Sequence, residues 1–127
     1  MAKRLDHLIW PVADLEKTVR FYTEVLGLEL LGQRDSFTVV RISDDCVLQL
    51  APWGSQGGGH LAFSMDSSEF REVQERIVES GIPYGDSFDQ VGNMRGPGIA
   101  EGARGETISL YCNDPSGHLI EIVSYKR

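Results

Sequence analysis

The feature of this 127-residue sequence that most constrains its fold is an internal repeat. The segment "DHLIWPVA" near the start is matched by "GHLAFSMD" near the middle, and each is followed by a helix pattern that stops at a glycine. His7 to Gly27 spans 20 positions and His60 to Gly81 spans 21, so the two halves keep register to within one residue. Self-similarity of this kind indicates two copies of one supersecondary unit.

Each half predicts one helix among short strands. In the first half, "RLDHLIWPVA" predicts a strand, and "DLEKTVRFYTEVLG" predicts an amphipathic helix with Asp14 as its N-cap. The runs "LELLGQ", "FTVVRI" and "CVLQLA" predict three more strands. In the second half the strand segments are "GHLAFSMD", "IPYGDSF", "ETISLYC" and "HLIEIVSY", and the helix has an apolar face of Phe70, Val73, Ile77 and Val78.

The order of these elements predicts the fold class. Each half is a βαβββ module, and the chain is long enough for one ordinary domain but too short for two. We therefore expect a single α+β domain with a mixed sheet. Its first module covers residues 4–52, a linker covers 53–58, and its second module covers 59–126.

The last strand places a carboxylate on an apolar face. In "DPSGHLIEIV", alternation puts Glu121 on the same side as Leu119 and Val123. An ionised carboxylate in apolar surroundings costs several kcal/mol unless it is paired or binds a metal. Glu121 therefore needs a partner.

The repeat suggests the partners. When the halves are overlaid, His7 falls on His60 and Gln49 falls on Glu121, and each histidine shares a face with apolar neighbours. Two imidazoles, a carboxylate and an amide oxygen form a ligand set for one divalent ion, with Zn, Fe, Mn, Co and Ni all compatible. Simpler interpretations remain: a histidine on an apolar face is often a hydrogen-bonded core residue, and a lone Glu121 is often an edge-strand carboxylate or a member of an ion pair. Gln49 either binds the ion or only lines its pocket.

Composition excludes several classes of partner. The net charge of −7 disfavours nucleic acid, and no apolar run is long enough to span a membrane. No signal peptide is recognisable, so we expect a cytoplasmic protein. In such a reducing compartment Cys46 and Cys112, both in apolar strand-like contexts, are expected to be buried thiols rather than a disulfide.

The repeated modules, the histidines of "DHL" and "GHLAF", the segment "DLEKTVRFYTEVLGLEL" and the closing "DPSGHLIEI" resemble the vicinal oxygen chelate superfamily over nearly the whole chain. That superfamily includes glyoxalase I, fosfomycin-resistance enzymes, extradiol dioxygenases and bleomycin-resistance proteins. The resemblance implies two curled half-barrels with a metal held between them, at the positions of His7, Gln49, His60 and Glu121. It also implies a homodimer and a small-molecule substrate.

The resemblance favours glyoxalase-like lyase or isomerase chemistry, in which Glu121 moves a proton and Tyr111 is a second catalytic candidate. Glyoxalase I has a glutamate where this chain has Gln49, and the fosfomycin enzymes have a hydroxyl where it has Ile9. The alternatives are an antibiotic-type binding or resistance protein and an extradiol-type dioxygenase.

Two further features have both a structural and a functional interpretation. The glycine-rich residues 85–106 predict a mobile loop, or a lid that offers Arg95 or Arg104 to an anionic substrate. Trp10 and Trp53 are expected to pack in the core or an interface, with Trp53 near enough to the first module's last strand to wall the pocket.

Overall fold

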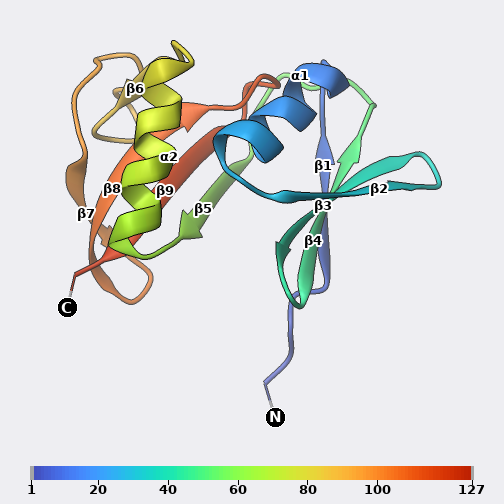
Figure 1. The fold of residues 1–127 in the computed structure, drawn as a ribbon, viewed down its shortest axis with the longest axis horizontal. Helices are drawn as coiled ribbons and strands as arrows, with labels where there is room; N and C mark the ends of the chain where they lie inside the picture. The colour runs from blue at the N-terminus through green and yellow to red at the C-terminus, as the bar shows by residue number, and fades with distance from the viewer. Residues whose placement is uncertain (1, 127) are drawn as a thin grey trace. The chain divides into compact units, whose positions relative to one another are not determined.

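The chain folds into two compact units, each with its own sheet. A computed structural model describes residues 2–126. One unit ends at Gln56 and the other begins at Gly57. Figure 1 follows the chain through the helices and strands of both units.

The first unit has a four-stranded sheet in the order β1-β4-β3-β2. β1 pairs with β4 in parallel, and the other pairs are antiparallel. The helix begins where Asp14 accepts a hydrogen bond from the backbone N–H of Lys17, and it ends near Gly27, whose φ is 82°. The elements are β1 (His7–Pro11), α1 (Leu15–Arg20), the π-helical η1 (Phe21–Val25), β2 (Glu29–Arg34), β3 (Phe37–Ser43) and β4 (Cys46–Ala51).

The second unit has a five-stranded sheet with the path β5-β9-β8-β6, and β7 pairs separately with β8. β5 and β9 are parallel, whereas β8 is antiparallel to β9, β6 and β7. Asp66 caps α2 by accepting from the N–H of Glu69. The elements are β5 (His60–Ser64), α2 (Ser67–Glu79), β6 (Tyr84–Gly85), β7 (Gly98–Gly102), β8 (Gly105–Asn113) and β9 (Leu119–Tyr125).

Apart from the additional β7 of the second unit, the two sheets have the same strand order, and their first and last strands pair in the same register. In each unit the first strand pairs in parallel with the last, and Ile9 lies opposite Gln49 just as Ala62 lies opposite Glu121. The α+β class and the βαβββ repeat are therefore confirmed. The expectation of a loop over 85–106 is wrong for its second half, because residues 98–102 form β7 against β8.

Each unit packs its helix against one face of its own sheet. In the first unit the buried Trp10 donates from Nε1 to the Tyr22 hydroxyl at 2.9 Å, which confirms Trp10 as a core residue. In the second unit α2 lies against β9, with Phe70, Val73 and Ile77 buried. Val78 is 48% exposed, so its predicted place on the apolar face is wrong.

Two sequence expectations concern the chain as a whole. Cys46 and Cys112 are both buried and free, as expected from their context. No helix among residues 2–126 is both long and apolar enough to cross a membrane.

Candidate metal site

The second unit brings His60 and Glu121 into direct contact. They lie on the adjacent parallel strands β5 and β9, two register positions apart, with His60 Nε2 3.1 Å from Glu121 Oε1. The carboxylate is recessed, with its side chain 11% exposed, whereas the imidazole is 48% exposed. The carboxylate therefore has the polar partner that its apolar face required.

The turn "DPSGH" sets the start of the strand that carries Glu121. Asp114 Oδ1 accepts hydrogen bonds from the backbone N–H groups of Ser116 and His118, at 2.8 and 3.0 Å. The N–H of Gly117, whose φ is 87°, donates to the Asp114 carbonyl. These bonds make a tight Asx-type connection between β8 and β9.

Tyr111 lies directly across from Glu121 in the β8–β9 pair. Burial, then the Glu121 charge and a hydrogen bond to that carboxylate, raise the pKa of Tyr111 to about 12, against a smaller lowering contribution from Ser109. The phenol therefore keeps its proton at physiological pH and donates a hydrogen bond to the carboxylate. Tyr111 is in contact with the candidate site, as a hydrogen-bond donor rather than a base.

A row of buried hydroxyl groups continues from Tyr111 along the same face of β8. Ser109 Oγ lies 2.7 Å from Thr107 Oγ1, and Thr107 Oγ1 donates to the carbonyl of Ala100 at 3.3 Å. Both hydroxyl residues are fully buried. The sequence analysis did not identify this row, although the alternation of Thr107, Ser109 and Tyr111 in "ETISLYC" is a visible signal for it.

The first unit carries His7 and Gln49 in the symmetric positions. His7 Nδ1 lies 2.7 Å from Asp6 Oδ2, and a carboxylate partner on one ring nitrogen is the usual support for a histidine that binds metal through the other. Gln49 lines a cavity of about 240 Å³. The other lining residues are Leu31, Gly32, Gln33, Arg34, Val39 and Val47.

The donor set of the second unit fits a divalent transition metal. Zinc binds histidine nitrogen and carboxylate oxygen at about 2.0–2.2 Å, so two such ligands lie about 3.0 Å apart at a right angle and about 3.4 Å apart at a tetrahedral angle. The 3.1 Å between His60 Nε2 and Glu121 Oε1 falls within this range. Among residues 2–126, no three His, Cys, Asp or Glu side chains form a cluster that could hold an ion. The pair in the second unit would therefore need ligands from elsewhere.

The two cysteines are not candidates for this set. Burial, with a smaller contribution from Asp114, raises the pKa of Cys112 to about 12. Burial, followed by the charge of Asp6, also raises the pKa of Cys46. The thiolate is the form that binds metal, and it is disfavoured at both positions.

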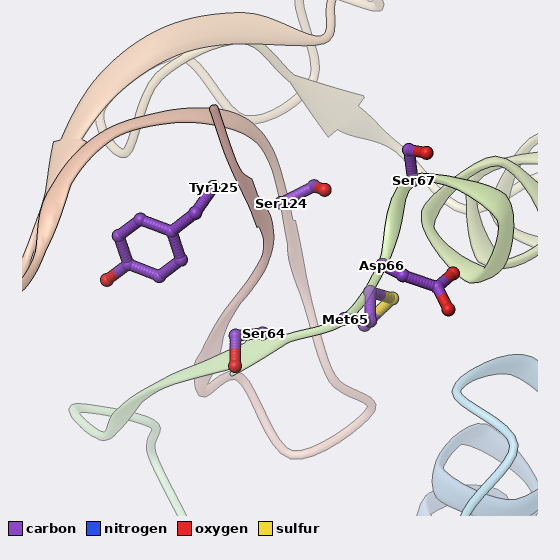
Figure 2. A pocket seen from close by; sticks show the side chains of 6 residues that line it. All are labelled: Ser64, Met65, Asp66, Ser67, Ser124 and Tyr125. Carbon is purple, nitrogen blue, oxygen red and sulfur yellow. The ribbon is translucent and has the colours of Figure 1, made fainter. Parts of the chain in front are cut away.

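A second cavity, of about 590 Å³, lies at the far end of β5 from His60. Figure 2 shows its lining residues, which come from the segment Ser64 to Ser67 and from Ser124 and Tyr125. The guanidinium of Arg104 lies 4.5 Å from the centre of the Tyr125 ring, and its backbone N–H donates to the Tyr125 hydroxyl. Arg104 therefore contacts Tyr125, one of the residues that line this cavity, and does not itself line it.

Arg95 and Trp53, which the sequence analysis considered as pocket residues, are both exposed. Arg95 is exposed, and its backbone N–H donates to the side chain of Asn93. Trp53 is 63% exposed and contacts Phe37 edge to face, with ring centres 5.9 Å apart. Trp53 is therefore not a core residue, and the alternative that it packs in an interface stays a prediction.

The sequence analysis missed His118. Its side chain is buried and its Nδ1 accepts a hydrogen bond from the backbone N–H of Gly59, the residue before His60. One feature of the sequence could have indicated this role. His118 directly precedes the last strand, β9, just as Gly59 directly precedes β5.

Comparison with known proteins agrees with this fold. The family model described as Glyoxalase/Bleomycin resistance protein/Dioxygenase superfamily matches residues 4–122. Virulence protein STM3117 of Salmonella typhimurium is 30% identical over 96% of this chain and 84% of its own length. Lactoylglutathione lyase of the same organism is 29% identical over 97% of this chain and 93% of its own.

A solved structure shows the same architecture. The oxidase ChaP-H2 has a TM-score of 0.81 and is 28% identical, with 99% of this chain and 96% of the other covered. The family match spans nearly all of both repeats, including the strands that carry His7 and Glu121. The chain therefore belongs to the glyoxalase/bleomycin resistance protein/dioxygenase superfamily.

Proposed function

We propose that this protein is a metal-dependent enzyme that chelates two neighbouring oxygens of a small substrate and performs glyoxalase-like lyase or isomerase chemistry. The observation that carries the proposal is the contact between His60 and Glu121, repeated in position by His7 and Gln49. One divalent ion would be held by these four side chains. Zn, Fe, Mn, Co and Ni all suit this mixed nitrogen and oxygen set.

The ion, when bound, supplies Lewis acidity to the substrate oxygens. Glu121 is the proposed proton carrier, because it is the recessed carboxylate of the set. The neutral phenol of Tyr111 donates to this carboxylate and restricts its orientation. On the other side, Asp6 orients the ring of His7 through Nδ1 and leaves Nε2 available as the ligand.

Similarity to lactoylglutathione lyase over nearly the full length of both chains supports the lyase assignment. Similarity to the oxidase ChaP-H2 supports an oxidative alternative, since two histidines and one carboxylate form the face used by non-haem iron oxygenases. A pure binding or resistance protein is the remaining alternative. The pairing of His60 with Glu121 argues against it, because a protein that only binds a small molecule has no need of donors suited to a metal.

The test is reconstitution followed by a substrate screen. The purified chain, stripped and reloaded with each of the five metals, would be assayed with 2-oxoaldehydes, catechols and epoxides. Turnover of a 2-oxoaldehyde that requires both metal and Glu121 supports the proposal. Oxygen consumption with catechols would support the dioxygenase alternative, and stoichiometric metal without turnover of any class would contradict both.

We further propose that the protein acts in the cytoplasm as a homodimer. The two free, buried thiols are typical of a reducing compartment. The proposed substrate is a small molecule, as for other members of the superfamily.

A further inference from the structure

His118 connects the turn before β9 to the residue before β5. Its side chain is only 3% exposed, and its Nδ1 accepts a hydrogen bond from the backbone N–H of Gly59 at 3.0 Å. Because Nδ1 is an acceptor, the ring proton is on Nε2. Gly59 is covalently attached to His60, the histidine that contacts Glu121.

The start of β5 is held against this turn at two more points. The N–H of Leu119 donates to the carbonyl of Gly59 at 2.9 Å. A Cβ on Gly57 would lie 2.5 Å from the carbonyl oxygen of Gly117, so the backbones approach too closely for any other residue. The backbone before His60 is thus bound to the same turn from which the strand of Glu121 begins.

The anchor at the other end of this hydrogen bond is itself rigid. The N–H of His118 donates to Asp114 Oδ1 at 3.0 Å, and its carbonyl accepts from the N–H of Asp114 at 2.9 Å. With its main chain fixed twice and its ring buried, His118 has little freedom to follow a displacement of Gly59. The bond therefore restrains Gly59 rather than His118.

The first unit provides an internal comparison. There the N–H of Val47 donates to the carbonyl of Asp6 at 3.1 Å, the counterpart of the bond between Leu119 and Gly59. The counterpart of His118 is Cys46, whose thiol donates weakly to the Val47 carbonyl and not to Asp6. Among residues 2–126, a bond from the side chain of this turn residue to the backbone N–H of the residue before the histidine is therefore found in the second unit and not in the first. The second unit is also the one in which histidine and carboxylate are in contact.

We propose that His118 is a positioning residue for the metal site, which acts through Gly59 to hold the His60 imidazole in line with Glu121. The effect of His118 on metal affinity rests on the proposed function, whereas its effect on the orientation of the His60 ring does not. Losing the acceptor would free the start of β5 and let the His60 ring turn away from the carboxylate. Partners that bond a metal ligand directly affect metal affinity by about 10- to 100-fold, and for His118, which acts through the neighbouring residue, we expect the lower end of this range.

Two substitutions of His118 separate the loss of its hydrogen-bond acceptor from the loss of the imidazole ring as such. In His118→Asn the amide Oδ1 lies at the same bond separation from the backbone as Nδ1 and can accept from Gly59, whereas His118→Ala removes the acceptor. Affinity for Co²⁺ would be measured on the full chain from the visible absorption of the ion. We expect His118→Ala to weaken Co²⁺ binding by about 10-fold or more, with an altered spectrum, and His118→Asn to restore most of the affinity.

A control addresses simple loss of stability. Ile77→Val shortens a buried side chain of α2, which is not part of the turn, and lowers stability without changing a polar contact. Its Co²⁺ affinity should equal that of the wild type. Equal damage in His118→Asn and His118→Ala, or wild-type affinity in His118→Ala, would overturn the proposal.

A metal-free measurement distinguishes failure of this inference from failure of the proposed function. In ¹⁵N-labelled protein, the ring nitrogens of His118 should show the Nε2–H form, and the His60 ring resonances should move in His118→Ala but not in His118→Asn. If these shifts occur in a wild-type protein that binds no Co²⁺, the positioning stands and the metal-dependent function fails. If the His60 resonances do not change in His118→Ala, the positioning itself is contradicted.

Discussion

Glu121 and Tyr111 form the residue pair with the most direct bearing on chemistry. The phenol donates to the carboxylate, so Tyr111 cannot serve as the base while Glu121 is ionised. Glu121 is therefore the proposed proton carrier, and Tyr111 is the hydrogen-bond donor that orients it. Each role predicts a different result when the side chain is changed.

Glu121→Gln should preserve the fold and much of the metal site while removing the base. An amide oxygen can still coordinate, but it cannot take a proton at neutral pH. Turnover on the substrate found by screening should fall by roughly 10²-fold or more, the usual scale for a general base. Metal content measured alongside turnover provides the control. Unchanged turnover, together with metal loss in Glu121→Ala, would make the residue a ligand only.

Tyr111→Phe should change how stability depends on alkaline pH. The pKa of Tyr111 is raised to about 12 in the folded chain from an ordinary value of 10.0. Between these values the unfolded chain loses the phenolic proton and the folded chain keeps it, so the free energy of unfolding falls as pH rises. The wild type should lose on the order of 2 kcal/mol more than Tyr111→Phe between pH 9 and 12. Denaturant titrations across that range would measure it, and parallel curves would contradict it.

The sequence predicted individual residues well where alternation decides their direction. Glu121 lies beside His60 because an offset of two residues along paired parallel strands keeps both side chains on one face of the sheet. His118 could not be found in this way, because its acceptor role depends on Gly59, 59 positions away in sequence. A tertiary hydrogen bond to a backbone group leaves no periodic signal.

At the scale of elements, the predicted helices and strands follow from local chemistry. Asp14 and Asp66 cap the helices, and Gly27 and Gly81, with φ of 82° and 70°, follow their ends. The π-helical η1 was not predicted, because it continues the same apolar pattern as α1. β7 was not predicted either, because its glycines were interpreted as the sign of a flexible loop.

In β7 the glycines serve close packing instead. A Cβ on Gly98 would lie 2.5 Å from the backbone oxygen of Asp86, and one on Gly102 would lie 2.7 Å from Thr107 Cγ2. Such distances require the neighbour to move, and backbone cannot move cheaply. The segment is thus glycine-rich because it passes close to other backbone and to β8.

Gly98→Ala should therefore destabilise the second unit. The new methyl group would overlap the Asp86 carbonyl, and overpacking of this kind costs about 1–3 kcal/mol. Chemical denaturation would give the free energy of unfolding. Glu101→Ala is the matched control, because it changes an exposed side chain on the same strand. Equal stability of the two variants would contradict close packing as the reason for a glycine at position 98.

For the whole molecule, we predict assembly into a homodimer. The first unit exposes several large apolar side chains, including Ile9 and Leu31, and each sheet ends in an edge strand. Exposed apolar surface and strand edges are commonly covered by a second chain. Sedimentation equilibrium at micromolar concentration should give about twice the chain mass of 14.1 kDa. A mass of one chain would contradict the dimer without affecting the metal proposal.

The repeat explains why so much of the molecule could be predicted from the sequence. One set of elements, found twice, fixed the topology of both sheets and the equivalence of His7 with His60. That equivalence also leads to the final prediction. If each unit supplies ligands to one ion, then removing a histidine from either unit should abolish the same binding event.

The chain should bind close to one divalent ion, and the ion should raise its thermal stability. At a free metal concentration of 100 times Kd, binding to the folded chain alone adds about 2.7 kcal/mol. His7→Ala and His60→Ala should each remove both the stoichiometric ion and this stabilisation, as measured by metal analysis and thermal unfolding with and without metal. His118→Asn is the matched control, because it removes the remaining histidine while keeping an acceptor for Gly59. If the double variant of His7 and His60 still retained one ion per chain, the ligands would have to lie elsewhere, and the contact between His60 and Glu121 would be a structural ion pair.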